Sequence, residues 1–246
     1  MTWDTSIWSS PPASLSLPAD EVHVWGLRLD RPAEPFVELL QPDEVARANR
    51  FYFEKDRKHF VVARGFLRLL LGWYLHVDPK RLQFAYGAWG KPSLDGEFRE
   101  SQLRFNMSHS HGVALYAVTE TREIGIDVEH VRADFASDDI ARRFFSPLEV
   151  GMLGELPEDD RVAAFFRCWT RKEAYIKATG RGLSQPLDGF DVTLGSGGKV
   201  ALLRIEDGEP ERWQLVDIAV GEDYAGALAV EKPVGNIRYW NGDDRA

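Results

Sequence analysis

Residues 123–131 read EIGIDVEHV, and this segment limits the possible folds more than any other in the chain. Aliphatic and acidic residues alternate in it, namely Ile124, Ile126 and Val128 with Asp127 and Glu129. Successive side chains of a β-strand face opposite sides, so both carboxylates share the face away from the aliphatic residues. An exposed strand face is the more common setting for such a pattern. In a half-buried setting the carboxylates must share a proton, pair with cations, or bind a hard divalent metal such as Mg²⁺.

Further strands are predicted on both sides of this segment. Strand-like alternation bounded by turn residues occurs in residues 22–30, 81–86, 103–110 and 113–120. The C-terminal third contains two predicted hairpins, at residues 191–205 and 213–230, with Gly-rich turns. Because the connections are short, we expect antiparallel sheets. Residues 9–20 are rich in Ser and Pro and predict an irregular leader, and no element is predicted after Pro233.

Three helices are predicted from periodicity and capping. In residues 53–75 one face is apolar, and Arg57, Arg64 and Arg68 form a stripe beside it. The sequence FFSPLEVGML predicts a helix with Ser146 as N-cap, Pro147 at its first position and Glu149 completing a capping box. A longer helix is predicted over residues 161–179, ending at Gly180.

The order of these elements predicts an α+β protein of two similar lobes. Each half of the chain offers one long helix and several antiparallel strands, with the division near residue 121, giving lobes of residues 1–121 and 122–246. No repeat is visible in the residues themselves, so this prediction depends on the order of the elements alone.

Charge and composition restrict the partners. The net charge of −9 argues against general binding of nucleic acid or anionic membranes. Residues 41–91, however, contain ten Lys or Arg and five Asp or Glu, and such a basic segment could bind a phosphorylated ligand or be a solvated helix face. The only cysteine, Cys168, excludes an internal disulfide. With no signal peptide or membrane span evident, we expect a cytoplasmic protein.

A second candidate site lies in CWTRKEAYIKATGRG, residues 168–182. Glu173 and Lys177 have the spacing of a surface ion pair. On a helical wheel, however, Glu173 falls among Trp169 and Ile176 on the apolar face, with Lys177 at its edge. A carboxylate placed there needs a partner, and a metal shared with the two acids of residues 123–131 would provide one. Three carboxylates around a cation, beside a lysine, suit polyphosphate chemistry.

A third candidate site is RFNMSHSHG, residues 104–112. The spacing of His109 and His111 makes a histidine metal site conceivable, although no further histidine or cysteine lies close in sequence to complete it. A polar turn is the more common setting, and Ser108 with His109 could alternatively bind phosphate. On the helical wheel Cys168 falls away from Glu173, which predicts a packing residue and not a nucleophile.

Together these segments resemble the Sfp-type 4′-phosphopantetheinyl transferases. The family signatures occur in order: G-K-P at residues 90–92, F-N-x-S-H-S at 105–110, G-I-D-x-E at 125–129 and W-[ST]-x-K-E-[AS]-x-x-K at 169–177. FFSPLE and GRGLSQPLDGFDV are also similar to family sequence, so the resemblance covers about residues 47–192. The ordered set is far more specific than any single signature.

The resemblance implies an enzyme of the holo-[acyl-carrier-protein] synthase type. Such enzymes move the phosphopantetheine arm of coenzyme A onto a serine of an acyl or peptidyl carrier protein, with Mg²⁺, and release adenosine 3′,5′-bisphosphate. The fold implied is two α+β lobes related by pseudo-twofold symmetry, with the active site between them. Since both lobes lie in one chain, we expect a monomer.

The resemblance also assigns roles by position. Asp127, Glu129 and Glu173 would be the metal ligands, and Glu173 also the base for the carrier serine. Lys177 would hold the pyrophosphate and assist the leaving group.

Other positions would bind coenzyme A. Ser108 and His109 would contact the nucleotide phosphates, and Arg47 would join His109 at the 3′-phosphate. Asn106 is a further candidate contact from the same strand, and Gly90 and Lys91 would lie by the adenine. Arg64 and Arg68 are weaker candidates, because helix packing explains them nearly as well.

Two other functions compete with this interpretation. A non-catalytic module on the same fold could bind coenzyme A or a carrier protein, but binding alone would not require a base. An unrelated Mg²⁺-dependent phosphohydrolase would explain the carboxylates but not the ordered signatures. The sequence does not indicate which carrier protein or pathway is served.

Overall fold

The structure is a computed structural model, and it describes residues 3–195, 198–206 and 208–246. Its helices are α1 (Glu34–Val37), α2 (Pro42–Ala48), α3 (Glu54–Leu75), α4 (Asp138–Phe144), α5 (Pro147–Glu155) and α6 (Glu158–Thr179). Its longer strands are β1 (Glu21–Arg28), β4 (Leu103–Ser110), β5 (Val113–Glu120), β6 (Ile124–His130), β9 (Trp213–Asp217), β10 (Tyr224–Glu231) and β11 (Asn236–Asn241). The short strands are β2 (Gln83–Tyr86), β3 (Pro92–Asp95), β7 (Phe190–Val192) and β8 (Leu202–Ile205).

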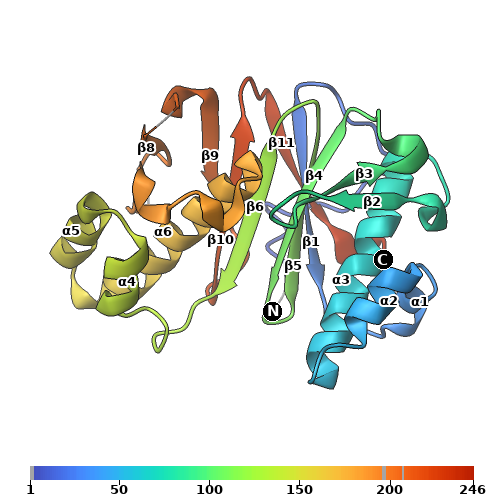
Figure 1. The fold of residues 1–246 in the computed structure, drawn as a ribbon, viewed down its shortest axis with the longest axis horizontal. Coiled ribbons are helices and arrows are strands. Elements are labelled where there is room, and N and C mark those ends of the chain that lie inside the picture. The colour runs from blue at the N-terminus through green and yellow to red at the C-terminus, as the bar shows by residue number, and fades with distance from the viewer. Residues whose placement is uncertain (1–2, 196–197, 207) are drawn as a thin grey trace.

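Two sheets lie between the two long helices, as Figure 1 shows. One sheet has the strand order β11-β1-β5-β4 and the other β6-β10-β9. A hydrophobic core that contains residues of α3 covers the outer face of the first sheet, and another that contains residues of α6 covers the outer face of the second. The predicted pair of α+β lobes is therefore confirmed, and α3 and α6 each have 22 residues.

The local predictions for the second lobe are confirmed. Ser146 accepts a hydrogen bond from the Glu149 backbone, and the Glu149 side chain completes the capping box of α5. Helix α6 ends at Gly180, whose φ of 67° is left-handed. In the hairpin predicted for residues 191–205, strands β7 and β8 pair, and residues 196 and 197 of its turn lie outside the described residues.

The last strand of the chain was not predicted. Strand β11 returns to the first lobe and pairs parallel with β1, so that sheet is not wholly antiparallel. A division at residue 121 therefore omits one strand of the first lobe's sheet. The strand was missed because its residues are all exposed or half-buried at the sheet edge, which weakens the apolar alternation that marks a strand.

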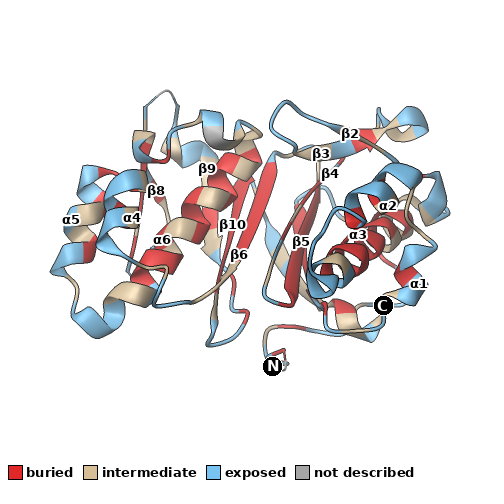
Figure 2. Cartoon of the chain, turned by 60° about the horizontal axis from the view of Figure 1, so that its bottom comes forward, coloured by how far each residue is buried: buried red, intermediate tan, exposed pale blue. Residues whose placement is uncertain are grey.

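A third core joins the two lobes. The inner faces of the two sheets are largely buried, including most of β5, β6 and β10 (Figure 2). This core contains Val22, Val24, Val113, Leu115 and Ala117 from the first sheet and Ile124, Ile126, Val128, Leu228 and Val230 from the second. Burial of such aliphatic side chains contributes about 1.5–3 kcal/mol each. The predicted aliphatic face of residues 123–131 is the face that enters this core.

Residues that precede the predicted leader of residues 9–20 also belong to the core between the lobes. Trp3 and Trp8 are buried there, with ring centroids 4.6 Å apart. The Trp8 indole donates a hydrogen bond to the Ala219 carbonyl of the second lobe (2.8 Å). A Cβ added at Gly26 of β1 would lie 2.5 Å from the Trp3 ring. The segment that carries Trp3 and Trp8 therefore packs across both lobes.

Strand β6 approaches helix α6 so closely that only glycine fits at position 125. A Cβ at Gly125 would lie 2.1 Å from the Ala174 carbonyl oxygen and 2.3 Å from the Ala178 amide nitrogen. Both of these are backbone atoms of α6, so no side chain can move to make room. The contact fixes Asp127, two residues further along β6, beside this helix.

We predict that Gly125→Ala lowers the free energy of unfolding by at least about 3 kcal/mol, the upper end of the usual cost of overpacking. Urea unfolding followed by circular dichroism measures the change. Gly151→Ala in α5 is the control, because a Cβ there meets no atom within 4 Å. The control should gain about 0.5–1 kcal/mol. Equal stabilities for Gly125→Ala and the parent protein would contradict the close contact.

Candidate active site

A seam of polar contacts joins the edge strands of the two lobes. Asn106, Ser108 and Ser110 share one face of β4, and each forms a hydrogen bond with β6. The Ile126 amide donates to Asn106 Oδ1 (2.9 Å), Ser108 Oγ donates to Asp127 Oδ1 (2.8 Å), and Ser110 Oγ donates to Glu129 Oε2 (2.8 Å). Asp127 is only 2% exposed and Glu129 is half-buried, so the alternative of an exposed strand face is wrong.

Lys177 crosses from α6 to this seam. Its Nζ donates to Asp127 Oδ1 (2.6 Å) and to Ser108 Oγ (2.9 Å). Lys177 thus neutralises the buried carboxylate of Asp127 on β6. It does not form the surface ion pair with Glu173 that the spacing in α6 allowed. The second oxygen of Asp127, Oδ2, is buried and has no hydrogen-bond partner among the described residues. A buried carboxylate oxygen without a partner is unfavourable, so this atom is a candidate ligand for a cation.

The three predicted carboxylates are electrostatic neighbours. Burial, and next the charge of Asp127, raise the pKa of Glu173 to about 7, against the opposing effect of Lys177. Burial and Asp127 also raise the pKa of Glu129. Among the described residues, no three Asp, Glu, His or Cys side chains form a ready metal site. The carboxylates are therefore coupled by charge without forming a complete coordination shell.

His109 faces the opposite side of β4 from the seam. Its exposed ring lines a cavity of about 330 Å³ with Phe51 and His59. The pKa of His109 is lowered, first because the surrounding protein partly desolvates the ring and next by the charge of Lys177. The charge of Arg47 also lowers it. Arg47 lines a neighbouring cavity of about 540 Å³ that also includes Phe51. The structure therefore brings the two candidates for the 3′-phosphate close together.

His111 does not join His109 in a histidine cluster. Its ring stacks on His130 of β6, with centroids 4.6 Å apart, and its φ of 42° places it in the turn after β4. The setting of a polar turn is confirmed for His111. Cys168 is buried, as predicted for a packing residue.

The other five candidates have structural roles within the chain. Lys91 Nζ donates to Glu123 Oε2 (3.0 Å) and to the Ala178 carbonyl (2.9 Å), so it links the lobes beside the end of α6. Gly90 occupies the β2–β3 turn with a φ of 80°. The buried Asn106 accepts a hydrogen bond from the Ile126 amide in the seam between the lobes. Arg64 and Arg68 both donate to Glu44 of α2, as helix packing predicts.

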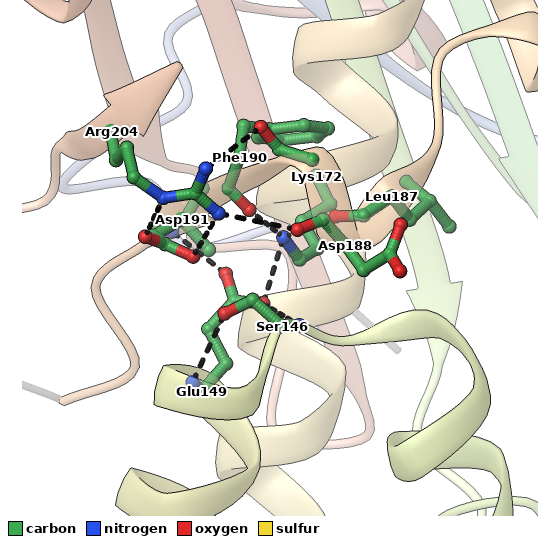
Figure 3. A network of polar contacts seen from close by, with 10 residues as sticks. Ser146, Glu149, Lys172, Leu187, Asp188, Phe190, Asp191 and Arg204 are labelled. Atoms are coloured by element: carbon green, nitrogen blue, oxygen red, sulfur yellow. Dashed lines mark hydrogen bonds and ion pairs between the residues drawn. The ribbon is translucent and has the colours of Figure 1, made fainter. Parts of the chain in front are cut away.

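Sequence reasoning missed the buried residue that anchors α6. Lys172 is fully buried, and its Nζ lies 2.8 Å from Glu149 Oε2 and donates to the carbonyls of Leu187 (2.7 Å) and Phe190 (2.5 Å) (Figure 3). All three hydrogens of the ammonium group therefore have acceptors. On a helical wheel Lys172 falls between Cys168 and the apolar face of α6, and this position could have indicated that its side chain is buried. This anchor holds the turn of α6 that carries Glu173.

Two family profiles match the chain. The profile described as 4′-phosphopantetheinyl transferase superfamily matches residues 123–229, and that described as 4′-phosphopantetheinyl transferase, N-terminal, matches residues 32–121. The 4′-phosphopantetheinyl transferase HetI of Nostoc sp. is 40% identical over 237 residues, which cover 95% of this chain and 98% of that protein. The chain belongs to the 4′-phosphopantetheinyl transferase superfamily.

More distant members of the superfamily are similar over most of their length. The 4′-phosphopantetheinyl transferase Sfp of Bacillus subtilis is 30% identical over 184 residues, covering 73% of this chain and 80% of that protein. The human L-aminoadipate-semialdehyde dehydrogenase-phosphopantetheinyl transferase is 27% identical over 217 residues, covering 81% of this chain and 70% of that protein. No helix in the described part of this transferase has the length and apolar character needed to cross a membrane.

We predict that Lys172→Met lowers the free energy of unfolding of this transferase by about 3–5 kcal/mol, because it leaves Glu149 charged and buried without its cation. Chemical denaturation at neutral pH measures the loss. Arg81→Met is the matched control, since it removes a cation from the exposed pair Arg81–Glu97 and should change stability little. A loss no larger for Lys172→Met than for the control would show that the buried pair does not anchor α6.

Proposed function

We propose that this transferase moves the 4′-phosphopantetheine arm of coenzyme A to a serine of an acyl or peptidyl carrier protein. The observation that supports this most directly is the seam between the lobes. There the buried Asp127 has one oxygen without a partner in the described part of the chain and binds Lys177 through the other, beside Glu129 and Glu173. A cation site next to a lysine suits the transfer of a phosphoryl group from a pyrophosphate.

The proposed reaction is a displacement at phosphorus. The oxygen of the carrier serine forms a bond to the phosphorus that bears pantetheine, and the bond from that phosphorus to the bridging pyrophosphate oxygen breaks. The leaving group is adenosine 3′,5′-bisphosphate. Glu173 accepts the serine proton. In the metal-free protein its pKa of about 7 leaves about half of this carboxyl group ionised near neutral pH, and a bound cation would favour the ionised form that acts as the base. Lys177 offsets the charge that develops on the leaving group.

Mg²⁺ fits the donor set of Asp127, Glu129 and Glu173. The set consists of oxygen ligands only, which Mg²⁺ prefers, and Asp127 Oδ2 needs a partner. A divalent cation at these carboxylates would lower their mutual repulsion and polarise the pyrophosphate oxygens. A bound cation would lower the pKa of Glu173, so the value of about 7 applies to the metal-free protein.

The nucleotide end of coenzyme A would lie in the first lobe. Arg47 and His109 stand near each other at two cavities that share Phe51, and we assign the 3′-phosphate to them. Ser108 belongs to the seam and would meet the nucleotide phosphates beside Lys177. Lys91 would reach the adenine only by changing its present partners, Glu123 and the Ala178 carbonyl.

A non-catalytic coenzyme A-binding module is the rival function. Binding alone does not explain why the described structure leaves Oδ2 of the buried Asp127 without a partner. It also does not explain why the pKa of the neighbouring Glu173 is raised to about 7. Since both lobes and every proposed site residue belong to one chain, a monomer is expected to be sufficient for activity.

We predict that a carrier protein incubated with the transferase, coenzyme A and Mg²⁺ gains the mass of one phosphopantetheine arm. Intact-mass spectrometry measures the gain, and chelation of the metal should prevent it. Asp127→Asn and Glu173→Gln should each lower kcat by at least about 10²-fold at saturating Mg²⁺, because each removes a ligand, and the second also the base. Coenzyme A affinity should change far less.

Asp139→Asn is the control, because that carboxylate is on the exposed surface of α4. It should transfer at the parent rate. Full activity of Asp127→Asn would refute the proposed cation site. Tight binding of coenzyme A by a parent protein that modifies no carrier protein would establish the binding module instead.

A further inference from the structure

The two lobes share a buried anchor that is invisible as a sequence repeat. In each, a short helix with a capping box places its glutamate against a cation on the following long helix, Glu44 of α2 against Arg68 and Glu149 of α5 against Lys172. Arg68 lies fourteen residues after Glu54, the first residue of α3. Lys172 likewise lies fourteen residues after the first residue of α6, Glu158.

The further partners of the two cations also correspond. Arg68 donates to the carbonyls of Pro79 (3.1 Å) and Leu82 (3.0 Å), which follow α3. Lys172 donates to two carbonyls that follow α6, shown in Figure 3. Arg68 lies 5.0 Å from the ring centroid of Phe84, and Lys172 lies 4.1 Å from that of Phe190. The anchor is therefore a common element of the pseudo-twofold fold.

Arg64 is where the first lobe departs from this common anchor. It lies ten residues after the start of α3, and the equivalent residue of α6 is the buried Cys168. Arg64 Nε donates to Glu44 Oε1, so this one carboxylate has two arginine partners. Although burial opposes ionisation, the bonds from Arg68 and Arg64 hold the pKa of Glu44 below its usual range. The cluster therefore carries one positive charge in excess.

Arg64 directs this charge toward a cavity. Its Nη2 donates to the hydroxyl of Tyr86 (2.5 Å), and its guanidinium lies 4.2 Å from the ring centroid of Phe84. Tyr86 is 44% exposed and lines the cavity of about 540 Å³ with Arg47 and Arg50 and with the acidic residues Asp43 and Glu44. Within the described residues, the hydroxyl hydrogen of Tyr86 has no acceptor. Since Arg64 occupies a lone pair of this oxygen, the hydroxyl is polarised as a donor to an anion.

We propose that Tyr86, held and polarised by Arg64, is a specificity-determining residue that binds a phosphomonoester in this cavity together with Arg47. Tyr86 contacts the ligand, and Arg64 is a positioning residue that acts through it. This inference rests on the proposed function, in which the phosphomonoester is the 3′-phosphate of coenzyme A. Dephospho-coenzyme A lacks that group and is otherwise the same molecule.

The test compares the affinities of coenzyme A and dephospho-coenzyme A by calorimetry with the parent protein, Tyr86→Phe and Arg64→Met. Both variants should lower the preference for coenzyme A about tenfold, the order expected for one charge-assisted hydrogen bond, and leave dephospho-coenzyme A binding unchanged. Tyr86→Phe removes only a partly exposed hydroxyl, so it tests the inference even if Arg64→Met fails to fold. Arg57→Met on α3, which loses an exposed partner of Glu54, should keep the parent preference.

Arg47→Ala separates this inference from the assignment on which it rests. If Arg47→Ala lowers the preference but Tyr86→Phe does not, the role of Tyr86 is refuted and the location of the phosphate stands. If neither variant changes the preference, the 3′-phosphate does not bind in this cavity, and both proposals fail. Equal losses of affinity for both ligands, or a lower melting temperature alone, would show that Arg64 and Tyr86 serve only the fold and would also refute their role.

Discussion

The backbone contact between β6 and α6, which Gly125 permits, is the constraint on which the candidate site depends. With a side chain at this position, strand and helix would separate, and Lys177 could not reach Asp127 at 2.6 Å. The same strand is held from the other side by Asn106 and the two serines of β4. Asp127 is thus fixed by the core, the helix and the first lobe at once.

The two lobes share a buried anchor, and the function proposed for each lobe depends on residues that the other lobe lacks. Both lobes anchor a long helix through a buried glutamate and a cation at the same helix position. In addition to that anchor, α6 carries Glu173 and Lys177, whose side chains lie at the seam between the lobes. Helix α3 instead carries Arg64, whose excess charge serves the cavity of the first lobe. Buried charge stabilises both lobes, and its placement distinguishes them.

Features that depend on neighbours in sequence could be predicted, whereas features that depend on distant partners could not. The Ser146 cap and the end of α6 at Gly180 follow from local backbone chemistry, and the position of Glu173 on an apolar helix face follows from periodicity. Strand β11 was missed because its half-exposed residues gain order only by pairing with β1. Lys172 was missed because its acceptors come from two segments that are distant from it in sequence, α5 and residues 187–190. The roles of the site residues came from a family resemblance, and they remain predictions.

The central claim is that Asp127, Glu129 and Glu173 behave as one charged site. A ¹³C NMR titration of the metal-free protein, with the Glu173 signal assigned by comparison with Glu173→Gln, tests it most directly. We expect an apparent pKa of about 7 for Glu173, with a lower value in Asp127→Asn because that variant removes a neighbouring negative charge. An apparent pKa near the ordinary 4.5 that is unchanged in Asp127→Asn would contradict the account.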